Sequence, residues 1–156
     1  MSQEATCGTY FAAEITRDPE RNLSLGRVTL RVRYAESDRM GVVFNAHYLT
    51  WFEIGRTELL RCAGTPYRSV EERGLNLPLI EATLRLRLPI RYDDVIVIQT
   101  WVDQLRSRAI SFSYNILCRD NLAAEGRSTH ACTRAQDGHT VAFPEWLASE
   151  IRKLVG

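Results

Sequence analysis

The sequence lacks both the long apolar runs of membrane proteins and the basic excess of nucleic-acid-binding proteins. No stretch is apolar over the roughly 20 residues that a membrane-spanning helix needs, and the opening MSQEATCGTYF has no cationic start followed by an apolar core. We therefore expect a cytoplasmic protein with no membrane span. The net charge is only +1, so the composition gives no support to nucleic-acid binding.

Motifs of the common catalytic and metal centres are also missing. The sequence contains no G-x-S-x-G nucleophile elbow, no glycine-rich phosphate loop and no H-E-x-x-H zinc motif. Its cysteines are widely spaced and include no C-x-x-C pair, which argues against zinc and redox sites and favours buried free thiols. These are Cys7, Cys62, Cys118 and Cys132. We expect neither a metal ion nor a separate cofactor.

What the sequence does contain is the pattern of one domain. Its 156 residues, 45% of them hydrophobic, suffice to bury about two-thirds of the unfolded surface. Apolar and polar residues alternate from Val28 to Tyr34, as in a half-buried strand. Apolar spacings of three, four and seven then predict a long helix over 47–62 that stops near Gly64. A short helix is predicted over 66–74, strands over 79–88, 95–105, 109–119 and 123–135, and a closing helix from Pro144.

One strand, a long helix and a run of antiparallel strands predict an α+β fold in which a curved sheet covers one central helix. We assign this domain to residues 26–156 and interpret residues 1–25 as an N-terminal arm or short strand. An open sheet leaves unpaired strand edges, and joining two copies edge to edge would satisfy them. A homodimer is therefore expected on physical grounds.

The first candidate for chemistry is Asp38, in the stretch YAESDRMGVVFNAHYLTWFE. It lies in a turn that contains Gly41, and Asn45 is a good N-cap for the helix that follows. Free N–H groups at a helix start can polarise an acyl carbonyl, and the same dipole favours an ionised Asp38. A carboxylate beside such an oxyanion site is the layout that acyl hydrolysis requires. The alternative is that Asp38 only stabilises the turn or caps the helix.

Two other polar residues of the helix have more than one interpretation. His47 could hydrogen-bond Asp38 or a substrate group, or it could be a surface or otherwise satisfied histidine. Glu53 could pair with Arg56 or Thr57 on the helix surface, or it could contact substrate from a pocket or serve as a base.

A basic turn, LRSRAISF, carries Arg106 and Arg108 on either side of Ser107. Alternate positions of a strand project to one face, so the two guanidinium groups could grip the phosphates of one ligand. A solvated turn is the alternative. Aromatic residues such as Tyr48 could line an acyl pocket but are more often part of the core. The sequence YDDV at 92–95 indicates only a polar turn before a strand.

Together these segments resemble a known family. The pattern Y-x-x-x-D-x-x-G-x-V-x-x-x-x-Y that begins at Tyr34, followed by WFEIGRTELLR and PIRYDDVIVIQTWV, is similar to the hotdog-fold acyl-CoA thioesterases of the 4-hydroxybenzoyl-CoA thioesterase family. Within that family it most resembles the bacterial enzymes associated with the Tol-Pal system. The resemblance covers about residues 28–143. It implies an antiparallel sheet wrapped around one long central helix, homodimers with a continuous sheet, usually paired into homotetramers, and active sites at the subunit interface.

The resemblance also implies roles for individual residues. Asp38 matches the catalytic carboxylate, which acts as nucleophile or as general base for water, and the N–H at Asn45 matches the group that polarises the thioester carbonyl. Many relatives read VVYHANY where this chain reads VVFNAHY, so the family's histidine role does not carry over directly to His47. Substrate contacts are expected from Gly41, Val43, His47, Tyr48 and Glu53, and contacts to coenzyme A phosphates from Arg106, Ser107 and Arg108.

We therefore predict a thioester hydrolase that cleaves an acyl-CoA, or an acyl group on the phosphopantetheine of an acyl carrier protein, to a free acid and a thiol. A non-catalytic acyl-CoA-binding module is the alternative from another class. A hotdog dehydratase is not favoured, because His47 and Glu53 do not face one another on the helix. Aromatic and short or medium aliphatic acyl groups all remain open.

Overall fold

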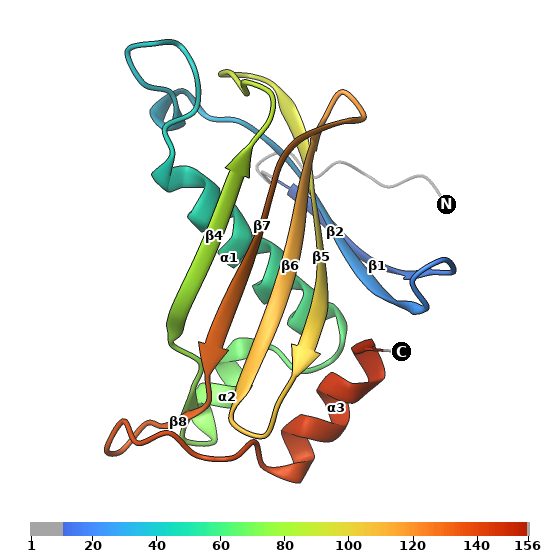
Figure 1. Cartoon of the computed structure of the whole chain (residues 1–156), viewed down its shortest axis with the longest axis vertical. Helices are drawn as coiled ribbons and strands as arrows, with labels where there is room; N and C mark the ends of the chain where they lie inside the picture. The colour runs from blue at the N-terminus through green and yellow to red at the C-terminus, as the bar shows by residue number, and fades with distance from the viewer. Residues whose placement is uncertain (1–10, 156) are drawn as a thin grey trace.

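The computed structural model describes residues 11–155 and shows a sheet curved around one long helix (Figure 1). In chain order the elements are β1 (Phe11–Asp18), β2 (Leu23–Arg31), the 3-10 helix η1 (Tyr34–Glu36), α1 (Ala46–Cys62), α2 (Tyr67–Glu72), β3 (Leu75–Asn76), β4 (Leu79–Leu86), β5 (Val95–Leu105), β6 (Ala109–Cys118), β7 (Asn121–Ala131), β8 (Thr133–Arg134) and α3 (Glu145–Val155). Six antiparallel strands are ordered β1-β2-β5-β6-β7-β4, so β1 and β4 are the edges. The predicted α+β hotdog arrangement is confirmed.

The central strands follow the predicted period of two. Ile98 and Val102 of β5 are buried, and they lie opposite Ile116 and Phe112 of β6 in the antiparallel register. Each such side chain contributes roughly 1.5–3 kcal/mol when it is removed from water. Because these residues point toward α1, the core lies between the sheet and that helix.

The helix α1 lies close to the sheet because a glycine leaves it room. Phe52 stacks on Tyr114 of β6 with ring centroids 4.2 Å apart. A Cβ atom added at Gly126 would overlap both the Phe52 ring and the Thr83 carbonyl oxygen, so β7 tolerates only glycine there. The helix ends just before Gly64, whose φ of +85° makes it the predicted stop.

One residue of the first predicted strand lies elsewhere. The alternation places Tyr34 on the buried face, but the strand ends at Arg31 and Tyr34 is 78% exposed. The chain turns there because the Ser37 hydroxyl donates to the Tyr34 carbonyl at 2.7 Å, which closes η1. The predicted inward positions of Val28 and Val32 are confirmed.

The strand expected over 123–135 is interrupted, because the Cys132 N–H donates to the Arg108 carbonyl at 2.9 Å and the chain leaves the large sheet. Its end forms β8, which pairs with β3. The expectation of buried thiols holds for Cys118 and Cys132 but is wrong for Cys62, which is exposed at the end of α1. Cys7 lies outside the described residues.

Part of the predicted N-terminal arm belongs to the sheet. From Phe11 to Asp18 the chain forms β1, which pairs along its whole length with β2. The earlier residues, 1–10, lie outside the described part. Within residues 11–155, no helix is long and apolar enough to cross a membrane.

Candidate active site

Asp38 lies in a tight turn between η1 and α1. Its N–H donates to the Val42 carbonyl at 2.9 Å, and its carbonyl accepts from the Gly41 N–H at 3.0 Å. Gly41 has a φ of +76°, a conformation that favours glycine. Two backbone hydrogen bonds and the glycine conformation therefore define this turn.

The Asp38 carboxylate has one oxygen bound and one free. Oδ1 accepts from the Met40 N–H at 2.7 Å, the contact expected of an aspartate in a turn. Within the described residues, Oδ2 has no hydrogen-bond donor and the half-buried carboxylate has no ion-pair partner. The turn interpretation therefore accounts for one oxygen and leaves the other open to substrate or water.

The start of α1 offers unused N–H groups. Asn45 occupies the predicted N-cap position, but its backbone is already helical and its side chain makes no capping hydrogen bond. The His47 N–H donates to the Phe44 carbonyl at 3.0 Å. In the part of the chain that the structure describes, the N–H groups of Asn45 and Ala46 have no backbone acceptor, and no acidic residue occupies the first turn. These N–H groups are available to an anion or a polarised carbonyl.

A buried carboxylate that the sequence analysis missed, Glu36, joins the Asp38 turn to α1. Its side chain accepts from the Arg33 N–H at 2.7 Å and from the Trp51 Nε1–H at 3.1 Å. Its carbonyl accepts from the Phe44 N–H at 2.9 Å. Glu36 is only 3% exposed, and a buried charge is tolerated only with such partners. No local pattern distinguishes it from the other polar residues of AESD.

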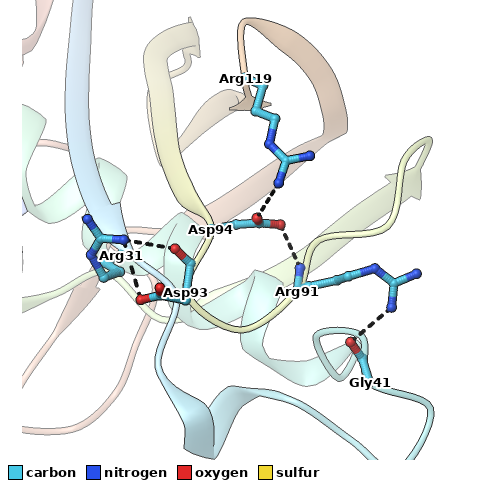
Figure 2. Close-up of polar contacts among 6 residues, drawn as sticks. All are labelled: Arg31, Gly41, Arg91, Asp93, Asp94 and Arg119. Carbon is cyan, nitrogen blue, oxygen red and sulfur yellow. Dashed lines mark hydrogen bonds and ion pairs between the residues drawn. The ribbon is translucent and has the colours of Figure 1, made fainter.

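The turn containing YDDV braces the Asp38 turn, which the sequence did not predict (Figure 2). Arg91 Nη1 donates to the Gly41 carbonyl at 3.3 Å, and the Arg91 N–H donates to Asp94 Oδ2 at 2.9 Å. The other oxygen of Asp94 accepts from Arg119 at 3.1 Å. Arg91 is therefore held on one side by Asp94 and contacts the turn of Asp38 on the other.

Further contacts join the same segments. The Val43 N–H donates to the Ile90 carbonyl at 2.8 Å. On the far side of the YDDV turn, Arg31 donates to the Asp93 carbonyl at 2.9 Å and to its carboxylate at 3.3 Å (Figure 2). Asp93 has a φ of +71°, which explains a polar residue at this tight position. The segment 90–94 thus holds the end of β2 and the Asp38 turn together.

The other predicted residues of this region differ in exposure. His47 is half-buried with its ring edge-on to Phe44, and no hydrogen bond or ion pair joins it to Asp38. Tyr48 is 2% exposed and packs edge-on to Trp51, so it lies in the core, where burial raises the pKa of its hydroxyl. Val43 is likewise buried. Direct substrate contact is therefore open to His47 and Gly41 more readily than to Tyr48 or Val43.

Glu53 is exposed and lines two cavities beside α1. The helix spacing allows an ion pair between Glu53 and Arg56, but these two residues do not form one in the structure. One turn farther along α1, Arg61 pairs with Glu58. Among residues 11–155, no three His, Cys, Asp or Glu side chains come together as a metal site would require.

The predicted coenzyme A contacts lie at the opposite end of the sheet. Arg106, Ser107 and Arg108 form the exposed turn between β5 and β6 (Figure 1). β5 has 11 residues, so it spans about 33 Å at roughly 3.3 Å per residue. Its first residue pairs with Arg31, at the end that bears the Asp38 turn. A single chain therefore does not bring the basic turn to Asp38.

The two arginines of the basic turn also differ from one another. Arg106 and Ser107 line a surface cavity of about 370 Å³ beside α3, together with Phe143, whereas Arg108 is not part of its lining. The Ser107 carbonyl accepts from the Phe143 N–H at 2.8 Å, which holds the turn against the segment that leads into α3. Arg106 and Ser107 therefore share a cavity lining that excludes Arg108, and the contact of all three with coenzyme A phosphates stays a prediction.

Comparison with known proteins identifies the family. The sequence model of the thioesterase-like superfamily matches residues 32–151. YneP of Bacillus subtilis, named provisionally as an acyl-CoA thioesterase, is 30% identical over 129 residues, which are 80% of this chain and 94% of that protein. The acyl-CoA thioester hydrolase YbgC of Escherichia coli O6:H1 is 27% identical over 85% of this chain and 99% of its own.

A solved structure is similar over the same region. The DHNA-CoA thioesterase from Staphylococcus aureus is 26% identical, with a TM-score of 0.78 over 83% of this chain and 92% of that chain. The resemblance drawn from the sequence motifs is thereby confirmed at the level of the family. On its match over most of its length, the chain belongs to the thioesterase-like superfamily.

Proposed function

We propose that the protein hydrolyses acyl-CoA thioesters, with Asp38 as nucleophile or general base and the start of α1 as the oxyanion site. One observation carries the proposal: Asp38 has a free Oδ2, and the bridge between Ser37 and Val43 ties its turn to the segment that leads into α1, where the N–H groups of Asn45 and Ala46 are unused. Relatives named as acyl-CoA thioesterases or thioester hydrolases align with nearly their full length, which supports the same reaction class.

The proposed chemistry divides the work between these groups. The thioester carbonyl oxygen accepts hydrogen bonds from the N–H groups at the helix start, which stabilise the negative charge that develops on it and are typically worth a factor of about 100 or more. Asp38 either attacks the carbonyl carbon to form an anhydride that water then opens, or removes a proton from the attacking water. In both routes the C–S bond breaks and the coenzyme A thiolate leaves.

A second copy of the chain would complete this site. The edge strand β4 exposes Ile80 to 61% and Leu79 and Leu86 to 48% each, and edge strands with exposed apolar residues are normally covered. Antiparallel pairing of two β4 edges turns one copy end for end relative to the other. The Asp38 turn of one copy then lies near the end of the sheet that carries the basic turn of the other.

This pairing would explain why one chain separates Asp38 from its expected coenzyme A contacts, Arg106, Ser107 and Arg108. Pairing of two such dimers into a tetramer, and an acyl carrier protein as alternative thiol carrier, stay predictions from the family resemblance. So do the individual substrate contacts of Gly41, Val43, His47, Tyr48 and Glu53.

Asp38→Asn tests the mechanism. Asparagine keeps an oxygen for the Met40 N–H and so preserves the turn, but it removes the nucleophile and base. We expect kcat for thiol release from acyl-CoA to fall by about 100-fold or more. Asp18→Asn is the matched control, because Asp18 accepts the Glu20 N–H at 2.9 Å in the same kind of turn at the other end of the sheet.

Full turnover by a folded Asp38→Asn protein would refute the mechanism. If the wild-type protein bound acyl-CoA but released no thiol across aromatic, short and long acyl groups, the non-catalytic binding module would be the better description.

A further inference from the structure

Two adjoining cavities lie between α1 and the side of the sheet formed by β7 and β4. Their volumes are about 220 and 160 Å³. Glu53 and Arg56 line both, so these two charged side chains stand between them. The other residues of the larger cavity are Thr57, Leu60, Tyr67, Leu77, Phe112 and His130.

One wall of the larger cavity belongs to a buried hydrogen-bonded chain. His130 Nδ1 lies 3.0 Å from the Leu77 carbonyl, which can only accept, so Nδ1 carries the proton. Nε2 then accepts from the Ser128 hydroxyl at 2.9 Å, and Ser128 Oγ accepts from the Tyr114 hydroxyl at 2.6 Å. Burial and the nearby charge of Arg56 lower the pKa of His130 to about 4, which keeps the ring neutral. Both ring nitrogens are therefore occupied, and His130 offers the cavity no free donor or acceptor.

Three residues that line the same cavity carry hydrogen-bond donors. Tyr67 Oη accepts from the Leu77 N–H at 3.0 Å, so its own proton remains available. Arg56 is half-buried and lies close enough to the Tyr114 hydroxyl to hydrogen-bond it, but among residues 11–155 it belongs to no ion pair, in contrast to Arg61 on the same helix. The Thr57 hydroxyl completes the set. Leaving a half-buried guanidinium without an anion is unfavourable, so this cavity is suited to an anionic group.

We propose that this cavity binds the far end of the acyl group and selects acyl groups that end in a carboxylate. The carboxylate would pair with Arg56 and accept hydrogen bonds from the hydroxyls of Tyr67 and Thr57. The apolar side chains of Leu60 and Phe112 line the path of the methylene groups that precede it.

The location of the cavities connects this subsite to the proposed reaction, on which the inference rests. Leu79 and Ala82 of the edge strand β4 line the smaller cavity, so the pair of cavities borders the edge at which the second copy is proposed to join. Leu79 is at the end of β4 that pairs with His130, away from the Asp38 turn of its own chain. End-for-end pairing brings the Asp38 turn of the other copy, and the thioester with it, toward this end.

Substitution of Glu53 should change the binding of a carboxylate in the opposite direction to substitution of Arg56. It is the only carboxylate among the residues that line the larger cavity, and it is exposed whereas Arg56 is half-buried. Its negative charge opposes a carboxylate ligand, so Glu53→Gln should strengthen the binding that Arg56→Gln weakens. A cavity that recognised only shape would not show opposite effects from these two changes.

The experiment measures binding of two S-alkyl coenzyme A thioethers of equal chain length, one ending in a carboxylate and the other in a methyl group. Isothermal titration calorimetry on the full-length protein should show at least about tenfold tighter binding of the carboxylate-ended compound, since hydrogen bonds to charged groups are strong. Arg56→Gln should remove this preference, Arg56→Lys should keep most of it, and Tyr67→Phe should reduce it. Glu53→Gln should increase it. Arg61→Gln, which removes an exposed arginine of the same helix, should leave it unchanged.

Equal weakening of both thioethers by Arg56→Gln, or tighter wild-type binding of the methyl-ended compound at every chain length tried, would overturn the proposal. Thioethers cannot be hydrolysed, so this result does not depend on turnover. Thiol release from an unsubstituted alkanoyl-CoA by the wild-type protein reports the proposed thioesterase activity separately.

Discussion

Acidification should destabilise the protein through His130. Burial, followed by the charge of Arg56, lowers the pKa of this histidine from its ordinary value of 6.5 to about 4 in the folded chain. Between these two values the unfolded chain binds a proton that the folded chain does not, so the free energy of unfolding falls as the pH falls. At about 1.4 kcal/mol per pH unit, the loss attributable to His130 reaches about 2 kcal/mol at pH 5 and about 3 kcal/mol near pH 4. Above pH 6.5 both states are neutral at this position and the contribution is constant.

The measurement is urea unfolding at a fixed protein concentration between pH 7.5 and 4.5, with wild type compared to His130→Asn. Asparagine can still donate to the Leu77 carbonyl but does not titrate. The variant should be less stable at pH 7.5 and should lose less stability on acidification, so the two curves converge toward low pH. His139→Asn, which removes an exposed histidine, is the matched control and should run parallel to wild type. Parallel curves for wild type and His130→Asn would show that His130 titrates alike in both states and would refute the reasoning.

Three further changes probe packing, positioning and the shared site. Gly126→Ala should lower stability by roughly 1–3 kcal/mol in urea unfolding, because the added methyl group overlaps α1 and β4; an unchanged midpoint would show that the helix can move away. Arg91→Ala removes the donor to the Gly41 carbonyl and should lower kcat several-fold with little change in melting temperature, and Arg91→Lys should recover part of kcat. A large fall in melting temperature alongside the fall in kcat would indicate a folding role instead. Chains carrying Asp38→Asn and chains carrying Arg106→Ala, unfolded and refolded together, should regain up to roughly a quarter of wild-type activity at low substrate. Random pairing makes half of the dimers mixed, and one of the two sites in each mixed dimer has both wild-type residues. No recovery would show that both residues of a site come from one chain.

The sequence predicted the fold well where burial comes from the chain itself. The range 95–105 and the helix over 47–62 agree with β5 and α1 to within one residue, because each has a face covered by the other. The same reasoning was less informative for β4. Its alternation of leucine and polar residues predicts a half-buried strand, yet nearly every position is exposed in the single chain. Alternating apolar and polar residues indicate that one face of a strand is buried, but they do not indicate whether the same chain or a second chain covers that face.

In the candidate site, too, the sequence predicts local features better than contacts between distant segments. The position of Asp38 in a turn and of Asn45 at the helix start could be predicted, because local rules govern turns and helix starts, whereas their proposed roles in the reaction stay predictions. Glu36 and Arg91 could not, since their roles depend on Trp51, 15 residues away, and on Gly41, 50 residues away. A local pattern assigns the same polar turn to YDDV whether or not the preceding residue, Arg91, reaches another segment.

The most informative disagreement concerns Arg106. Family resemblance places Arg106 and Asp38 on one substrate, whereas one chain keeps them about a strand length apart, roughly 33 Å for 11 residues. Both statements hold if two chains share each site, and the exposed apolar residues of β4 give an independent physical reason for the chains to join. Activity would then depend on assembly, because a separated chain would carry the carboxylate and the helix start without the phosphate contacts that position coenzyme A. A polar substitution of Ile80, which is exposed on β4 in the single chain, would then lower turnover by weakening the assembly, although it lies far from the proposed chemistry at Asp38.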